Sequence, residues 1–211
     1  MDEAVLRSRL WDGFARLQVL LGRHAMQGAV VERDGVVASI VPAAPESPTL
    51  NAAVALEPEL AIHAVPELAE RWRTARVRRW GVWLDGRAKR VASALQRTGL
   101  ALSASSPGMG ADLEQLEIPG LNGRVIPADL ATVGRVNDVA YGNPDRRLER
   151  TLEPLPRGVL RGFRCDDEGR PAAVALAMHH GEDCGVSFVA TVPAARRRGL
   201  ARLVMLAALP S

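Results

Sequence analysis

The spacing of apolar residues divides the chain into helical and extended segments. Across residues 2–26 apolar positions recur every three or four residues, which is typical of an amphipathic helix. Alternating apolar positions on both sides of Asp34-Gly35 predict a hairpin of two short strands, 29–32 and 36–41. The same criteria predict helices at 66–76 and 88–97, and strands at 51–56, 77–85 and 100–105. The first half of the chain is therefore expected to form a small sheet with helices.

A second pattern begins after residues 118–123, whose proline, asparagine and glycines make this segment the best candidate for a linker. Beyond it we expect a strand at 124–126, a helix at 127–141 and a charged segment at 145–152. Three strand-like runs follow with short connections, which indicates an antiparallel meander. They span 159–165, 172–179 and 185–192. We therefore expect an N-terminal α/β domain at 1–117 and a second domain at 124–211.

Composition places the chain among globular proteins, because 47% of its residues are hydrophobic. Only Lys89 among the 27 basic residues is a lysine, and the formal net charge is +3. This charge is far from the dense cationic stripes of nucleic-acid-binding proteins, so nucleic acid is an unlikely partner. For the arginines between 71 and 79, a solvated helix face is favoured over a nucleic-acid patch.

The two cysteines and the amino terminus bear on metals and on location. Cys165 and Cys184 have neither a C-x-x-C spacing nor a recurrent spacing with histidine, so no metal site is expected. Acidic Asp2 and Glu3 and the charges that follow do not fit a secretory signal. No uncharged run reaches the roughly 18 residues of a membrane span. We expect a cytoplasmic protein with no membrane partner.

The stretch from 186 to 209 carries the clearest chemistry. A β-branched apolar run breaks at Pro193, passes through three arginines and a glycine, and resumes as an apolar helix. We expect residues 197–202 to form the first turn of that helix, where backbone N–H groups lack intrahelical acceptors. Gly199 and Ala201 leave room for a pyrophosphate to approach the backbone, and the arginines supply positive charge. The stretch therefore predicts an anion-binding loop.

This loop resembles the acyl-CoA-binding signature of the GCN5-related N-acetyltransferase superfamily. The signature is Gln/Arg-x-x-Gly-x-Gly/Ala after a splayed strand, and Arg196, Gly199 and Ala201 match it here behind the strand 188–193. The resemblance implies an α/β (α+β) acyl-CoA N-acyltransferase fold, with a mixed, largely antiparallel sheet flanked by helices. It also implies acetyl-CoA as cosubstrate. No metal is implied.

The resemblance assigns residues to the cosubstrate. It implies that Val189, Ala190 and Thr191 offer backbone hydrogen bonds to the pantetheine arm. The pyrophosphate is expected on the loop and first helical turn. Its predicted ligands are Arg196, Arg197, Arg198, Gly199, Leu200, Ala201 and Arg202.

The catalytic residues are not assigned by the sequence. Some family members place a glutamate before the thioester-facing strand, but Gly185 holds that position here. The titratable residues nearby are His179, His180, Glu182 and Asp183, for which a solvated role is favoured. The family usually selects its amine with the first helix and the segment after it. Here that segment is 137–150, with Asp138, Tyr141, Asn143 and Asp145.

Two functions are compatible with these residues. The first is an N-acetyltransferase that moves an acetyl group from acetyl-CoA to an amine. The second is a non-catalytic acyl-CoA-binding or vestigial regulatory protein. The family continues past the helix at 200–209 with further strands, so we expect the domain to be incomplete at its C-terminus and capable of self-association. The first half resembles the later half of an acetyltransferase without its phosphate loop, which suggests a degenerate repeat.

Overall fold

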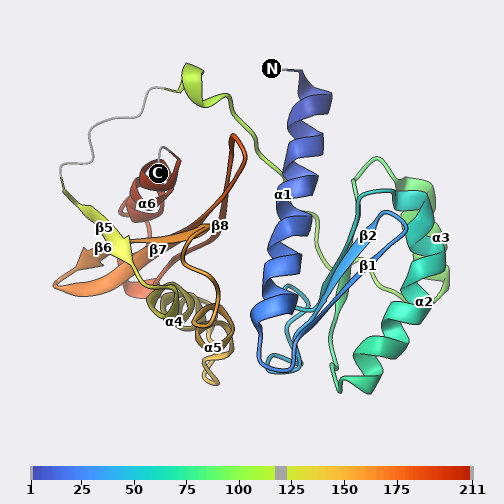
Figure 1. Ribbon diagram of the computed structural model, residues 1–211. Coiled ribbons are helices and arrows are strands. Elements are labelled where there is room, and N and C mark those ends of the chain that lie inside the picture. The colour runs from blue at the N-terminus through green and yellow to red at the C-terminus, as the bar shows by residue number, and fades with distance from the viewer. Residues whose placement is uncertain (1, 117–122, 210–211) are drawn as a thin grey trace. The chain divides into compact units, whose positions relative to one another are not determined.

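The computed structural model of the protein describes residues 2–116 and 123–209. They form two compact units, one from residue 2 to 110 and the other from residue 111 onward (Figure 1). The expected linker at 118–123 lies, apart from Gly123, outside the described residues, so that boundary stays a prediction. Among the helices that the structure describes, none is long and apolar enough to cross a membrane.

The first unit, 2–110, contains one four-stranded sheet in the order β1-β2-β3-β4. The strands are β1 Ala29–Arg33, β2 Val36–Ile40, β3 Ala52–Ala55 and β4 Gly81–Trp83. The first three pair antiparallel, whereas β4 pairs with β3 in parallel. Asp34 and Gly35 both adopt positive φ, 45° and 70°, as a two-residue hairpin turn requires. The predicted hairpin is therefore confirmed.

Helices cover both faces of this sheet. Helix α1 (Glu3–His24) packs on one face, and α2 (Pro58–Thr74) and α3 (Lys89–Arg97) pack on the other (Figure 1). Trp72 of α2 is fully buried, stacks on Trp80 with ring centroids 4.6 Å apart, and donates its indole N–H to the carbonyl of Ser39 at 2.9 Å. These contacts fix α2 against β2, so the unit has a packed core of its own.

Three of the elements predicted for this unit differ from the structure. Helix α2 begins at Pro58, eight residues before the predicted start, and Pro66 lies inside it. Pro66 is on the exposed side of the helix, where water can hydrate the carbonyl that loses its N–H partner. Only Gly81–Trp83 of the predicted strand 77–85 is extended in the sheet. The predicted strand 100–105 is irregular, because residues 101–105 are exposed and pair with none of the described strands.

The second unit also contains a four-stranded sheet, here entirely antiparallel, in the order β5-β6-β7-β8. The strands are β5 Val125–Ala128, β6 Leu160–Asp167, β7 Arg170–His180 and β8 Asp183–Thr191. The predicted meander is confirmed. The helices are α4 Leu130–Tyr141, α5 Arg147–Leu152 and α6 Leu200–Ala208, with short 3₁₀ turns at Leu113–Gln115 and Pro193–Ala195.

Helix α4 packs on one face of this sheet and α6 on the other (Figure 1). The prediction that α4 begins at 127 is wrong, because Pro127 and Ala128 belong to β5. Asp129 is the N-cap, and its carboxylate accepts the N–H of Thr132 at 2.6 Å. Helix α5 crosses α4 closely at Gly134, where a Cβ atom would collide with the backbone of Glu149. The glycine inside α4 is therefore explained by the approach of a second helix.

Candidate functional site

Strand β8 carries a bulge near its middle. Val174 of β7 pairs with Ala190 and Leu176 pairs with Ser187, so two residues of β8 oppose the single residue Ala175. The first of the two, Phe188, has a φ of 48°. This conformation costs a bulky residue on the order of 1–3 kcal/mol, so surrounding contacts must hold it. The bulge turns the last residues of β8 relative to β7.

Val189, the second bulge residue, and the two residues after it lie on an edge of the sheet. Strand β8 pairs with β7 alone among the described strands. Ala190 is buried, and Val189 and Thr191 are partly buried. The outer edge of β8 therefore offers backbone groups to a ligand or to another strand. These are the three residues that the family resemblance assigns to the pantetheine arm.

The loop after β8 leads into the N-terminus of α6. The prediction that residues 197–202 form its first turn is wrong at the start, because α6 begins at Leu200. Gly199 is the N-cap with a φ of 75°, and Arg197 also has a positive φ of 64°. In the described part of the chain, no hydrogen-bond acceptor faces the N–H groups of residues 199–202. The loop thus presents four consecutive backbone donors at the positive end of a helix.

Two of the predicted arginines are held by the protein itself. Arg196 donates to the carbonyls of Ala140 at 2.7 Å and Thr191 at 3.3 Å, so it ties the end of α4 to the end of β8. Arg198 forms a bidentate ion pair with Asp167 of β6 at 2.6 and 2.8 Å. This pairing raises the pKa of Arg198. Both side chains therefore brace the loop.

The other two arginines have no such partner. Across the described residues, neither Arg197 nor Arg202 forms a side-chain hydrogen bond or an ion pair, and both are exposed. A Cβ atom on Gly199 would meet nothing within 4 Å, so the backbone between them is open to solvent. Four free N–H donors and two uncommitted guanidinium groups are the chemistry that an anion-binding site requires, and a diphosphate has enough oxygens to accept from both sets of donors.

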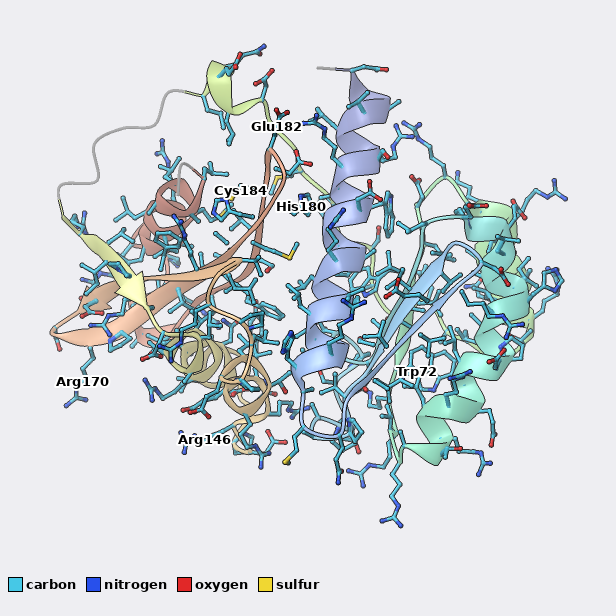
Figure 2. All side chains as sticks on the ribbon, in the orientation of Figure 1. Trp72, Arg146, Arg170, His180, Glu182 and Cys184 are labelled. Atoms are coloured by element: carbon cyan, nitrogen blue, oxygen red, sulfur yellow. The ribbon has the colours of Figure 1, made fainter. Side chains whose placement is uncertain are left out.

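The titratable residues of the β7–β8 hairpin lie at its tip. Figure 2 shows His180, Glu182 and Cys184 there, away from the loop before α6. His180 Nδ1 lies 3.7 Å from the carboxylate of Asp183, and burial together with the charge of Arg161 lowers the pKa of His179. Burial raises the pKa of the Cys184 thiol, whose Sγ contacts the carbonyl of Ala208 at 3.3 Å. None of these contacts adjoins the bulge at Phe188.

The segment expected to select the amine contains a capping residue. The buried carboxylate of Asp138 accepts the N–H groups of Leu148 and Glu149 at 3.0–3.2 Å, so it caps α5. Asn143 donates to the same carboxylate at 3.3 Å. Tyr141 is exposed, and Asp145 pairs with Arg147 at 3.1 Å. Asp138 and Asn143 are therefore engaged in holding α4, α5 and their connection together.

Some residues of the site escape sequence reasoning. Asp167 lies 31 residues before the arginine it pairs with, and nothing in the local sequence announces that contact. Asn137 was expected only on one face of α4 and in the amine-selecting segment, yet it reaches the carbonyl of Phe188 at 2.8 Å. Gly134 did carry a signal, because a glycine in mid-helix costs about 1 kcal/mol relative to alanine and needs a packing reason.

The second unit also has a groove away from this loop, and it is not a candidate for the cosubstrate site. A groove of about 470 Å³ lies at the opposite edge of the same sheet, between β5, β6 and the start of α4. It includes Arg157 and Arg161 but none of the residues predicted to bind the cosubstrate. Within the described ranges, no group of three or more histidine, cysteine, aspartate or glutamate side chains could hold a metal ion.

Comparisons with known proteins bear on the fold. No protein-family model matches the chain, and no curated protein matches it either. Among solved structures, a GCN5-related N-acetyltransferase from Kribbella flavida is similar, with a TM-score of 0.63 and 19% sequence identity. The similarity covers 95% of this chain and 78% of that one, so it extends over both units. The protein therefore has the fold of a GCN5-related N-acetyltransferase, as the resemblance of the loop implied.

Proposed function

We propose that the second unit binds acetyl-CoA at β8 and the N-terminus of α6 and transfers the acetyl group to an amine. The observation that carries this proposal is the set of four acceptor-free N–H groups at 199–202 beside two uncommitted arginines. They adjoin the end of a bulged edge strand. The acyltransferase fold of the similar structure agrees with it.

Different residues of the second unit bind different parts of the cosubstrate in this proposal. The backbone of 199–202 with Arg197 and Arg202 holds the pyrophosphate, while Arg196 and Arg198 keep the loop in place. The edge of β8 at 189–191 pairs with the amide groups of the pantetheine arm. This placement brings an acyl thioester toward the bulge, where a neutral amine attacks its carbonyl carbon; the C–S bond breaks, the thiolate departs, and the amine loses one proton to solvent. We assign no side chain as base or acid.

The first unit is proposed to be a degenerate copy. Both units contain a helix, a three-stranded antiparallel meander, and a helix that follows the third strand. In the first unit the loop before the second helix is short, and that helix starts with Glu57 as its N-cap and Pro58 as its first residue, in place of arginines and glycine. A carboxylate repels phosphate and proline lacks an N–H, so no diphosphate site is expected there.

The partners follow from this chemistry. They are acetyl-CoA and an amine, in the cytoplasm, without a membrane, a metal or nucleic acid. The free edge of β8 also supports self-association by strand pairing. Helix α6 does not add to it, because the described residues of that helix include no exposed large apolar side chain. Light scattering of the purified protein measures this directly, and a monomer at all concentrations would contradict it.

Binding and turnover separate the enzyme from the alternative. We expect calorimetry to show CoA and acetyl-CoA binding with one site per chain. A thiol-release assay with acetyl-CoA and a panel of primary amines then detects transfer. Binding with transfer supports the enzyme, whereas binding without transfer to any amine favours a non-catalytic acyl-CoA-binding or regulatory protein. Absence of CoA binding would overturn both.

A further inference from the structure

A buried amide on α4 reaches across to the bulge of β8. Asn137 is 2% exposed, and its Nδ2 donates to the carbonyl of Val133 at 2.9 Å and to the carbonyl of Phe188 at 2.8 Å. The two N–H bonds of the amide are thus both used. The opposite orientation of the amide would set its oxygen against two carbonyl oxygens, so the contacts settle which atom is which.

The second of these hydrogen bonds holds a strained residue. Phe188 is the first residue of the bulge, and its φ of 48° turns its carbonyl toward α4. Among the described residues, no other group from outside the sheet donates to that carbonyl. Phe188 is partly buried, and a carbonyl turned out of the regular ladder there needs a donor, which Asn137 supplies. The amide therefore stabilises the bulge itself.

Fixing this carbonyl also fixes the next backbone donor. The carbonyl of Phe188 and the N–H of Val189 belong to one planar trans peptide and point in opposite directions. Because Asn137 holds the carbonyl toward α4, the N–H of Val189 must point away from α4.

We propose that Asn137 is a positioning residue. By holding the bulge of β8 in place, it directs the N–H of Val189 so that this donor can polarise the carbonyl of a bound acyl thioester. This inference rests on the proposed function of the second unit. Asn137 touches neither phosphate nor acyl group; it acts through the peptide plane between Phe188 and Val189. The phosphate-binding loop lies beyond the end of the strand, so loss of this amide affects the reacting carbonyl and leaves cosubstrate affinity nearly unchanged.

The test compares binding with polarisation. Acetyl-CoA carrying ¹³C at the thioester carbonyl is bound to the wild type, to Asn137→Ala and to Val133→Ala, and its carbonyl stretch is measured by infrared difference spectroscopy. Val133→Ala is the matched control, since it loosens packing of the same helix and removes no donor to β8. Calorimetry supplies the dissociation constants.

We expect a lowered stretching frequency in the wild type and in Val133→Ala, and loss of most of that shift in Asn137→Ala. The dissociation constants should agree within about threefold, because the two sites are separate. With an amine acceptor, kcat of Asn137→Ala should fall about tenfold or more while KM for acetyl-CoA stays. An unchanged frequency shift in Asn137→Ala, or an equal loss in Val133→Ala, would overturn the proposal.

A second variant covers the case in which Asn137→Ala does not fold. In Asn137→Ser the shorter side chain keeps a donor that reaches only the preceding carbonyl at Val133, so the same loss of frequency shift is expected. A wild-type shift in this variant contradicts the inference. Failure of the wild type to bind acetyl-CoA would instead overturn the proposed function, and with it this role of Asn137. The two failures are therefore distinguishable.

Discussion

Two helices occupy the same place in the two units and offer a ligand opposite conditions. Helix α2 follows β3 and helix α6 follows β8, each after the third strand of an antiparallel meander. Helix α2 begins with Glu57 as an N-cap that forms no side-chain cap hydrogen bond, followed by Pro58 and Glu59. Helix α6 begins with Gly199, with three arginines before it and one in its first turn. The first N-terminus repels an anion and the second attracts it.

The two units also differ in whether a strand covers the outer edge of the third meander strand. In the first unit β4 pairs with β3 in parallel and covers its outer edge. In the second unit, as far as the structure describes it, no strand covers the outer edge of β8. The first unit also contains all four tryptophans, with Trp72 at the centre of its core. The third strand of the meander is thus covered by a neighbouring strand in the first unit, whereas in the described part of the second unit its outer backbone groups remain available to a ligand.

The largest expected effect separates the stabilities of the two units. In Gly134→Ala the new methyl group collides with the backbone of α5, so the second unit should lose about 2–3 kcal/mol. Far-ultraviolet circular dichroism reports both units, whereas tryptophan fluorescence reports the first unit only. We expect the dichroism transition to move to lower urea and the fluorescence transition to stay. Equal shifts in both signals would show that the units do not unfold separately.

The next effect concerns the loop glycine. Gly199→Glu places a carboxylate beside the free N–H groups, so CoA affinity should fall about 10- to 100-fold, or roughly 1–3 kcal/mol. Gly99→Glu is a matched control, because Gly99 also has positive φ and open space around its Cβ position but lies in the first unit. Calorimetry should show wild-type affinity for Gly99→Glu. Equal affinities for all three proteins would refute the loop assignment.

A smaller loss is expected for single arginines. Arg197→Ala and Arg202→Ala each remove one uncommitted charge, so each should weaken CoA binding by about fivefold to tenfold and reduce its dependence on salt. Arg76→Ala is the control, since Arg76 shares the positive φ of Arg197 and lies in the first unit. A loss of affinity in Arg76→Ala as large as in Arg197→Ala would contradict the difference between the two units.

The smallest effect is a pH dependence of the second unit. The backbone N–H of Thr132 lowers the pKa of Asp129, so this carboxylate stabilises the fold above its unfolded pKa. That contribution is lost as the pH falls through the lowered folded value, below about pH 4. Asp129→Asn keeps a capping acceptor and should flatten the acid dependence of the dichroism transition. An unchanged slope would show that another group governs it.

Local patterns predicted most of the strands and helices. The hairpin at Asp34-Gly35 and the second-unit meander follow from alternation and turn residues, which act over a few positions. The start of α2 escaped because Pro66 suggests a first turn while Pro58 occupies it. The strand at 100–105 failed because alternation alone does not supply a pairing partner. Element boundaries thus depended on tertiary contacts.

The candidate site was predictable in type but not in detail. The arginines, the glycine and the following apolar run indicate an anion-binding helix N-terminus without knowledge of the fold. Which arginines remain free depends on Asp167 and Ala140, both distant in sequence. The role of Asn137 depends on a bulge that no local pattern announces. Long-range partners therefore decide which of the predicted residues can contact a ligand.

The central claim is that only the helix after β8 receives the diphosphate. Amide ¹⁵N shifts of the labelled protein, recorded during a CoA titration, test it most directly because each backbone N–H reports separately. We predict saturable shifts at Gly199, Leu200, Ala201 and Arg202, weaker ones at 189–191, and none beyond the noise at Glu57, Glu59 and Leu60, which carry the N–H groups at the start of α2. Shifts concentrated at Glu57, Glu59 and Leu60, or no shifts at 199–202 in excess CoA, would contradict the account.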